Sequence, residues 1–597
     1  MICLAHTNAW TRPFALLFIA FSCCFSPSAQ SFMNNPQGRQ ITSLNGKWQV
    51  IVDPYNRGLA AKFFQDRKPE KNTDFVEYGF DKQTLHVPGD WNYQDPHLYF
   101  YEGSVWYKKE FTAKLEQGKR AFLYFGGANY LTTVYLNGKK IGSHEGGFTP
   151  FQFEVTAALV TGDNKLIVSV NNQRKEDAIP ALNYDWWNYG GITRDVSLIE
   201  TPESFVDKYF IQLKKGSLNK IEGWVHINGG NRKSITLMIP KAGISKQLMP
   251  DTSGTAYFTA EANNLHLWSP KDPFRYDINI STPSENISEK IGFRSIEVKG
   301  LDILLNGNPV FLKGVCLHEE FAPQERRAVS VQDAKQLLQS AKDLGCNFIR
   351  TAHYPQNEHI VEMAEAMGLM IWEEIPVWQN IQFSNPIILA KTNTLLQEMV
   401  ERDRNRCAVI VWSLSNETAP APDRDRVLTN MAASCRAMDN TRLVSSAFDH
   451  VKIDGNKTII EDTLAKVLDV IGINRYMGWY KAWPAEPGTM TFESVFNKPM
   501  IMTEFGCEAK YGNHGAANVA GLWNEEFQEK LYQDNIAMLK NIPFLRGVSP
   551  WVLYDFRSPT RLNPQTQEGW NRKGLLSNKG EKKKAWYVMK AYYDSIQ

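Results

Sequence analysis

Short apolar runs separated by turn residues fill the N-terminal third of the chain. Between residue 41 and about residue 200 these runs have strand length, and few positions repeat with the period of a helix. The run at 134–136 leads into Asn137-Gly138, a pair that favours a tight hairpin turn. The pattern predicts a β-sandwich of the jelly-roll type for residues 30–201.

A second β-rich segment, residues 202–298, is smaller and more polar. Its strand-length runs include 221–227, 234–239 and 276–280, and its length suits about seven strands. We therefore expect an immunoglobulin-like sandwich here, although no Cys…Trp…Cys pattern marks an antibody-type domain.

From residue 299 onward, apolar runs alternate with segments of helical period. The segment 331–344, for example, repeats apolar residues at helical spacing. The apolar runs lie at 311–315, 346–350, 369–372, 409–414, 443–447, 470–473, 500–503 and 548–553. Eight such β/α units predict a TIM barrel over residues 299–597, with its chemistry at the carboxyl ends of the strands.

Composition and charge narrow the class of protein. Apolar residues make up 43% and charged residues 22%, which excludes a disordered chain. Because 66 Lys and Arg nearly balance 64 Asp and Glu, we expect no nucleic-acid partner. The many aromatic residues suit sugar binding, but most of them will simply fill cores.

The first 29 residues resemble a signal peptide. Arg12 precedes an apolar stretch at 14–25 that is too short to span a bilayer, and cleavage after Ala29 fits. We expect an exported protein, periplasmic or secreted, with lipoprotein anchoring through Cys23 or Cys24 as the alternative. Five cysteines remain beyond the leader, an odd number without close spacing, so no disulfide framework or CxxC metal pattern is expected.

Two apolar runs of the predicted barrel each end in a single glutamate. Glu417 follows the fourth run and Glu504 follows the seventh. A carboxylate at the mouth of a buried strand needs partners that offset its desolvation. Two carboxylates across a pocket are what glycoside hydrolysis requires, one as general acid and the other as nucleophile.

At these motifs the sequence resembles the family 2 glycoside hydrolases, and within them the β-glucuronidases. The resemblance covers about residues 40–597 and rests first on Ser413-Leu414-Ser415-Asn416-Glu417 and Thr503-Glu504-Phe505-Gly506. It implies the predicted domain order, with Glu417 as acid/base and Glu504 as nucleophile. Asn416 would then contact the sugar 2-hydroxyl.

The resemblance extends to other strand ends and implies further site residues. Arg350 and His353 would support the two carboxylates, and Trp551 would form a floor under the sugar ring. The remaining substrate-binding residues that it implies are Asp185, His318, Asn474, Tyr476 and Tyr480.

A short motif after the eighth run bears on the choice of sugar. Asn571-Arg572-Lys573 matches the Asn-x-Lys of β-glucuronidases, so Asn571 and Lys573 would bind the carboxylate of a terminal uronic acid. One departure is Gln567, where the enteric type has an arginine; Arg557 and Arg561 are candidate replacements.

A second departure from the enteric type is the short connection after the third run. The chain runs quickly from Glu374 through Trp378 to a helical segment at 387–401. A short loop predicts an open mouth that accepts oligosaccharides better than small drug conjugates.

The leading hypothesis is an exo-acting retaining β-glucuronidase that needs no cofactor, and its oligomeric state is left open. A β-galactosidase or β-galacturonidase on the same scaffold, and a carbohydrate-binding protein without activity, are the alternatives. A metal site built from His318, Glu319, His353 and Glu374 is a weaker one, because no HxH or HExxH spacing supports it.

Overall fold

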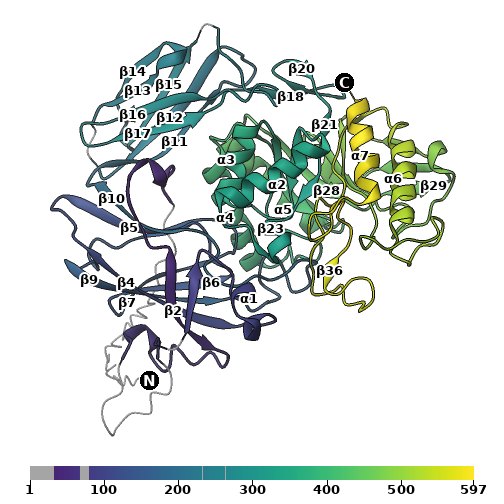
Figure 1. Cartoon of the computed structure of the whole chain (residues 1–597). Coiled ribbons are helices and arrows are strands. Elements are labelled where there is room, and N and C mark those ends of the chain that lie inside the picture. Colours follow the sequence, from purple (N-terminus) through teal and green to yellow (C-terminus); the bar gives the residue numbers. More distant parts are fainter. Residues whose placement is uncertain (1–31, 68–78, 82, 231–232, 263, 597) are drawn as a thin grey trace, which may run out of the picture.

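The computed structural model describes residues 32–67, 79–81, 83–230, 233–262 and 264–596. The predicted leader, residues 1–29, lies outside the described residues. The described chain forms two β-sandwiches and a barrel, which confirms the predicted fold class (Figure 1).

The N-terminal sandwich packs a six-stranded antiparallel sheet on a four-stranded one. The larger sheet has the order β3 (Gln83–Val87), β2 (Gly46–Asp53), β4 (Ser104–Ala113), β9 (Gly162–Asn171), β6 (Leu131–Leu136), β7 (Lys139–Glu145). The smaller has the order β1 (Gln40–Ser43), β10 (Val196–Pro202), β5 (Lys119–Phe125), β8 (Phe151–Glu154). The predicted turn at Asn137-Gly138 joins β6 to β7, with both residues at positive φ.

The second sandwich contains seven strands around its own apolar core. One sheet has the order β11 (Phe205–Leu213), β12 (Lys220–Asn228), β15 (Thr255–Glu261). The other has the order β14 (Ile244–Leu248), β13 (Ile235–Ile239), β16 (Tyr276–Ser281), β17 (Asn286–Ile291). A small sheet of β18 (Ile296–Lys299), β19 (Asp302–Leu305) and β20 (Asn308–Pro309) leads into the barrel.

The barrel is a closed parallel sheet. Its first strand is divided into β21 (Leu312–Lys313), which pairs with the last strand, and β22 (Cys316–Leu317), which pairs with the second. The remaining strands are β25 (Phe348–Thr351), β26 (Met370–Glu374), β27 (Val409–Asn416), β28 (Leu443–Phe448), β31 (Ile471–Asn474), β33 (Met500–Glu504) and β34 (Leu545–Val548). The division of the first strand closes the ring of eight.

Helices surround most of the barrel (Figure 1). They are α2 (Val331–Leu344), α3 (Glu358–Met367), α4 (Pro386–Asp403), α5 (Pro422–Met438), α6 (Glu525–Leu539) and α7 (Lys584–Ser595). Helix α2 has the predicted bounds because Ser330 and Asp333 form a capping box and Gly345 ends it at positive φ. No described helix has both the length and the apolar character needed to cross a membrane.

The expectation of a helix after every barrel strand is wrong for the fifth and sixth units. Within the described residues these connections hold the strands β29 (Lys452–Asp454), β30 (Lys457–Ile460) and β32 (Thr491–Ser494) and two short 3₁₀ helices. Gly455 at positive φ turns β29 into β30, and Pro484 and Pro487 interrupt the sixth connection.

The predicted eighth strand, 548–553, is also misplaced. The strand is β34 (Leu545–Val548), and Trp551 lies three residues beyond its end, in buried non-strand backbone. An apolar run indicates burial rather than strand geometry. The predicted strand was therefore placed too far toward the C-terminus, at the end of the barrel where the cavity lies.

The long loop at 172–195, between β9 and β10, carries the N-terminal sandwich to the mouth of the barrel. Buried Arg194 forms a 2.7 Å ion pair with Glu319 and donates to the carbonyl of Pro355. Asn172 and Asn188 exchange hydrogen bonds within the loop. These contacts fix the position of Asp185 over the barrel.

Candidate active site

Glu417 and Glu504 line one cavity of about 560 Å³ at the carboxyl ends of the barrel strands. Glu504 is the last residue of β33, and Glu417 directly follows β27. Glu417 has a φ of 52°, in the left-handed region that non-glycine residues rarely adopt. Its backbone N–H donates to Ala447 on the next strand, which holds this conformation in place.

A cation and a hydroxyl contact the Glu504 carboxylate. Arg350 donates to its Oε1 at 2.7 Å and Tyr476 to its Oε2 at 2.6 Å. Arg350 is itself held by Glu374 at 2.9 Å, and His353 contacts the same carboxylate at 2.7 Å. The guanidinium is thus fixed between two carboxylates and cannot turn away from Glu504.

Only neutral amides contact the Glu417 carboxylate. Gln379 donates to its Oε2 at 3.0 Å, and Asn474 donates to its Oε1 at 2.9 Å. The orientation of the Asn474 amide is set because its oxygen accepts from the Thr503 hydroxyl at 2.7 Å.

The surroundings of Glu417 and Glu504 favour a state in which the two carboxyl groups together carry one proton. Burial raises the pKa of Glu417, and the Asp449 carboxylate raises it further. Burial also raises the pKa of Glu504, opposed by Arg350 and reinforced by the charge of Glu417. A cation and a hydroxyl donate to Glu504, so we assign the negative charge to Glu504 and the proton to Glu417.

A cationic corner formed by Arg561 and Lys573 lies in the same cavity. Arg561 donates to Asp185 at 2.6 Å and to the Tyr480 hydroxyl at 3.0 Å. The Lys573 ammonium lies 5.0 Å from the centre of the Tyr480 ring. Its contacts with Asn571 Oδ1 at 3.5 Å and with Glu508 Oε1 at 3.6 Å are both long.

Of the two candidate replacements for the arginine missing at position 567, Arg561 lines the cavity. Gln567 is buried and donates to Glu508 at 2.8 Å, so it does not line the cavity. Arg557 stacks on Tyr99 and Trp187 instead of facing the cavity. Of the two candidates, only Arg561 reaches the cavity.

Most of the residues predicted for the site line the cavity. They are Asp185, His353, Glu417, Asn474, Tyr476, Tyr480, Glu504, Trp551 and Lys573. Trp551 stacks on His353 at 4.7 Å between ring centres, and Trp186, from the same loop as Asp185, adds to this aromatic wall.

Four predicted residues, His318, Arg350, Asn416 and Asn571, lie behind the wall instead of in it. His318 packs against Trp551, so the expectation that it lines the pocket is not met. Asn571 is fully buried and donates to Asp185 at 3.1 Å, which makes it a support for the corner. Asn416 accepts from Arg350, and its Nδ2 is buried without a hydrogen-bond partner.

The comparisons with known proteins agree with this geometry. Residues 296–597 match the family model described as glycosyl hydrolases family 2, TIM barrel domain. Residues 41–202 match the model described as glycosyl hydrolases family 2, sugar binding domain. The chain belongs to glycosyl hydrolase family 2.

Individual relatives cover nearly the whole chain of this glycoside hydrolase. It is 27% identical to a putative β-glucuronidase of Formosa agariphila, over 96% of this chain and 76% of that protein. It is 26% identical to a β-glucuronidase of Paenibacillus borealis, over 94% and 97% of the two chains. The solved structure of an uncultured Clostridium sp. β-glucuronidase has a TM-score of 0.80 and 25% identity, covering 95% of this chain and all of that one. The resemblance inferred from the sequence motifs is confirmed.

Several cavity residues of the glycoside hydrolase were not predicted as site residues. Gln379, Asp449 and Arg475 follow the third, fifth and sixth barrel strands and line the cavity. Their position after strand ends was a usable signal, because barrel sites are built there. Glu508, which holds Lys573 and Gln567, follows the nucleophile strand and was also missed.

The four residues weighed as a metal site have other partners. Glu319 binds Arg194 and Arg327, whereas Glu374 binds Arg350 and His353. Among the residues that the structure describes, no group of three or more His, Cys, Asp or Glu side chains is arranged to hold a metal ion.

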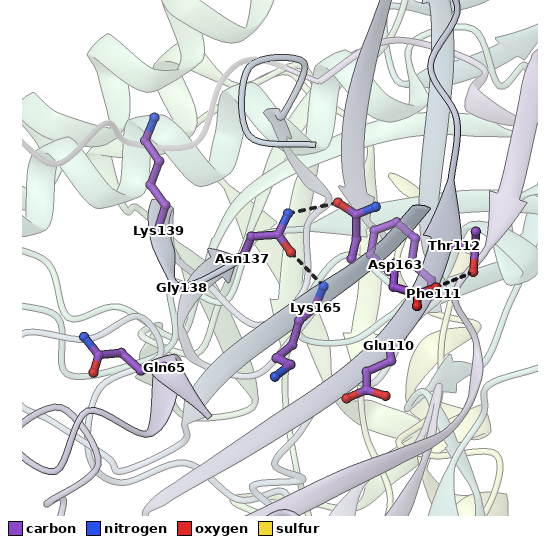
Figure 2. Close-up of a pocket in the computed structure, with 10 residues that line it drawn as sticks. Gln65, Glu110, Phe111, Thr112, Asn137, Gly138, Lys139, Asp163 and Lys165 are labelled. Atoms are coloured by element: carbon purple, nitrogen blue, oxygen red, sulfur yellow. Dashed lines mark hydrogen bonds between the residues drawn. The ribbon is translucent and has the colours of Figure 1, made fainter. Parts of the chain in front are cut away.

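A second hollow lies on the N-terminal sandwich, away from the carboxylates (Figure 2). It is lined by Gln65 and by residues of β4, β7, β9 and the β6–β7 turn, and some of its polar side chains pair with one another. Asn137 bonds to Asn164 and to the backbone of Lys165, and Thr112 donates to Asp163. Because Glu417 and Glu504 both line the barrel cavity and neither lines this hollow, the barrel cavity remains the candidate active site.

Proposed function

We propose that this protein is an exo-acting retaining β-glucuronidase. It would release terminal β-D-glucuronic acid from glycoconjugates or from oligosaccharides derived from polysaccharides. The observation that carries the proposal is the cationic corner of Arg561 and Lys573 in the same cavity as Glu417 and Glu504. The β-glucuronidases of Formosa agariphila and Paenibacillus borealis, as relatives over most of the chain, support the same substrate class.

The corner is suited to a carboxylate ligand. Lys573 is buried, yet its ammonium makes only long contacts with Asn571 and Glu508, so it retains donors for an incoming anion. Arg561 adds a guanidinium whose Nε is buried without a partner. A uronate carboxylate would supply charge-assisted hydrogen bonds to both cations.

The reaction would proceed by two displacements. Glu504 attacks the anomeric carbon while the bond to the leaving oxygen breaks, and the proton of Glu417 passes to that oxygen. Glu417, now ionised, then takes a proton from water, whose oxygen attacks the anomeric carbon and releases Glu504. Asn416, behind the cavity wall, accepts from Arg350 and Asn474 and so would hold these two side chains in position during both steps.

We also propose that oligosaccharides are better substrates than small aryl conjugates. The connection between β26 and α4 spans only residues 375–385 and contributes Trp378 and Gln379 to the cavity wall. A short connection leaves room beyond the acid/base for a sugar as the leaving group. A strong preference for 4-nitrophenyl β-D-glucuronide over glucuronyl disaccharides would overturn this second proposal.

The deciding experiment compares initial rates on 4-nitrophenyl β-D-glucuronide, β-D-galacturonide and β-D-galactoside. Wild-type protein should prefer the glucuronide, and Lys573→Ala should lower its kcat/KM by roughly 10- to 100-fold, as expected for a charge-assisted hydrogen bond. Exposed Lys579 lies in the same basic segment, so Lys579→Ala is the matched control and should change the rate less than about twofold.

Each other outcome identifies a different function. Preference for the galacturonide would keep the uronate corner and change the sugar. Galactoside turnover that is insensitive to Lys573→Ala would make the motif an ordinary basic segment. Binding of glucuronate without turnover of any of the three substrates would favour the carbohydrate-binding alternative.

We propose, finally, that the protein is exported. The apolar stretch and the cleavage position in residues 1–29 support this location. Expression with and without residues 1–29, followed by fractionation and N-terminal sequencing, tests it. Retention of an intact N-terminus in the cytoplasm would overturn the proposal, and a mature chain that begins at Cys23 or Cys24 would favour lipid anchoring.

A further inference from the structure

Arg475 is a buried cation of the cavity that has no hydrogen-bond or ion-pair partner among the described residues. Arg475 directly follows β31, lines the cavity and is only 8% exposed. Its guanidinium forms no hydrogen bond or ion pair with any described residue, and its Nε is fully enclosed. Arg350 and Arg561 in the same site each contact at least one carboxylate. A buried guanidinium that forms no ion pair is costly, so its presence at the cavity wall needs an explanation.

Arg475 belongs to the acid/base side of the cavity. Asp449 follows β28, which pairs on one side with β27, the strand before Glu417, and on the other with β31, the strand before Arg475. All three residues line the cavity, and the Asp449 carboxylate acts electrostatically on both neighbours. Arg561 and Lys573 of the cationic corner both contact Glu508, and among the described residues neither contacts Arg475. Because a general acid must face the leaving oxygen, side chains gathered around Glu417 face the leaving group.

We propose that Arg475 forms a subsite for an oxyanion, a carboxylate or a sulfate, carried by the leaving sugar. The inference rests on the proposed glycosidase function and adds the chemical class of the leaving group. A planar guanidinium with unused donors matches both anions, and either one would supply the charge that the cavity wall lacks.

The surroundings of Arg475 restrict how such an anion could bind. Asp449 is the nearby anion, yet it forms no ion pair with Arg475, and Gln379 is engaged with Glu417. The anionic group of the leaving sugar must therefore approach Arg475 away from Asp449. A neutral leaving sugar would leave Arg475 unpaired in the complex as well.

The test uses three disaccharides in which β-glucuronic acid is linked to galactose, to galactose 6-sulfate or to galacturonic acid. For the wild-type protein we expect kcat/KM on at least one acidic disaccharide to exceed that on the neutral one by tenfold or more. Arg475→Gln should reduce this ratio to less than threefold, and Arg475→Lys should restore part of it. The two acidic arms distinguish a sulfate from a carboxylate.

The matched control is Lys481→Gln, which removes an exposed cation from the rim of the same cavity. Lys481→Gln should change the ratio of kcat/KM on acidic to neutral disaccharides less than twofold, because the preference is expected to come from direct binding to Arg475 and not from the general positive potential of the cavity. A wild-type ratio near one overturns the inference without any variant, even if Arg475→Gln fails to fold. A ratio that survives in Arg475→Gln overturns it as well. Loss of turnover on 4-nitrophenyl β-D-glucuronide in the wild-type protein would instead refute the proposed function itself.

Discussion

The walls around Glu504 and around Glu417 differ in how completely their charges are compensated. Arg350 and Tyr476 hold Glu504, and the neighbouring corner joins Arg561 to Asp185 by a short ion pair. Among the residues that the structure describes, only amides contact the Glu417 carboxylate, and the Arg475 guanidinium has no hydrogen-bond partner. Under the proposed roles, the charges that would face the terminal sugar already have partners, whereas an anion on the leaving sugar would supply the partner that Arg475 lacks.

This difference explains how two identical side chains at matching strand ends acquire opposite roles. A carboxylate that accepts from a guanidinium and a hydroxyl stays ionised and can attack carbon. A buried carboxyl with an anionic neighbour and only amide donors keeps its proton and can give it to an oxygen. Changes on each side should therefore produce distinguishable kinetic defects.

The largest effect is expected from Glu504→Gln. An amide cannot form the glycosyl ester, so kcat should fall by at least about 10⁴-fold on every glucuronide, whatever its leaving group. Steady-state rates on 4-nitrophenyl β-D-glucuronide, with binding of glucuronate measured by calorimetry, check this expectation. Because Gln preserves shape, retained binding is the control for folding, and substantial residual turnover would remove Glu504 from the nucleophile role.

Glu417→Ala should separate leaving groups. A sugar leaving group needs protonation and should lose roughly 10²- to 10⁴-fold in kcat, whereas an activated aryl group should lose far less. Parallel kinetics on a glucuronyl disaccharide and on 4-nitrophenyl β-D-glucuronide measure the difference. Equal losses on both substrates would contradict the acid/base assignment and the comparison of the two walls.

Arg561→Gln tests the compensated side. Removing the guanidinium takes one charge-assisted bond from the uronate and an ion-pair partner from Asp185. We expect kcat/KM on the glucuronide to fall by about 1.5–3 kcal/mol in transition-state stabilisation, or roughly 10- to 100-fold. The matched control is Arg557→Gln, because Arg557 stacks on Tyr99 and Trp187 outside the cavity. An equal loss of kcat/KM in Arg561→Gln and Arg557→Gln would indicate a general structural defect in the segment 557–561 rather than a lost contact with the uronate.

The sequence predicted the strand ends of the barrel better than the loops around them. Glu417 and Glu504 could be found because each lies at the end of an apolar run, a local pattern that needs no tertiary information, whereas Tyr476 was implied by the family resemblance. Trp551 was assigned to the site although the strand before it was misplaced. Apolar runs report burial, and burial continues past the strand into the floor of the cavity.

The charge pairing within the site could not be predicted from local pattern. Arg561 reaches the cavity and Arg557 does not, although these two arginines are close together in the sequence. Their positions depend on aromatic residues of the N-terminal sandwich and on Asp185, which are distant in sequence. Asn571 is a further example. Its motif could be recognised in the sequence, but its burial behind Asp185 could not be predicted from it.

The smallest effect is expected from Asp449→Asn, which changes the charge beside the acid/base without touching either carboxylate. Catalysis needs Glu504 ionised and Glu417 protonated, so the rate should rise and then fall with pH. The Asp449 charge raises the pKa of Glu417, so its removal should lower that pKa.

The alkaline limb of kcat/KM should therefore move to lower pH, by up to about one pH unit, while the acid limb moves less. A pH profile on 4-nitrophenyl β-D-glucuronide measures the shift, with exposed Asp454→Asn on β29 as the matched control. A shift of the alkaline limb to higher pH would contradict the expected effect of Asp449 on the pKa of Glu417. The assignment of the proton to Glu417 would then have to be revised. An unmoved alkaline limb would show that the charge of Asp449 is screened from Glu417, and the uncompensated side of the cavity would then comprise Arg475 alone.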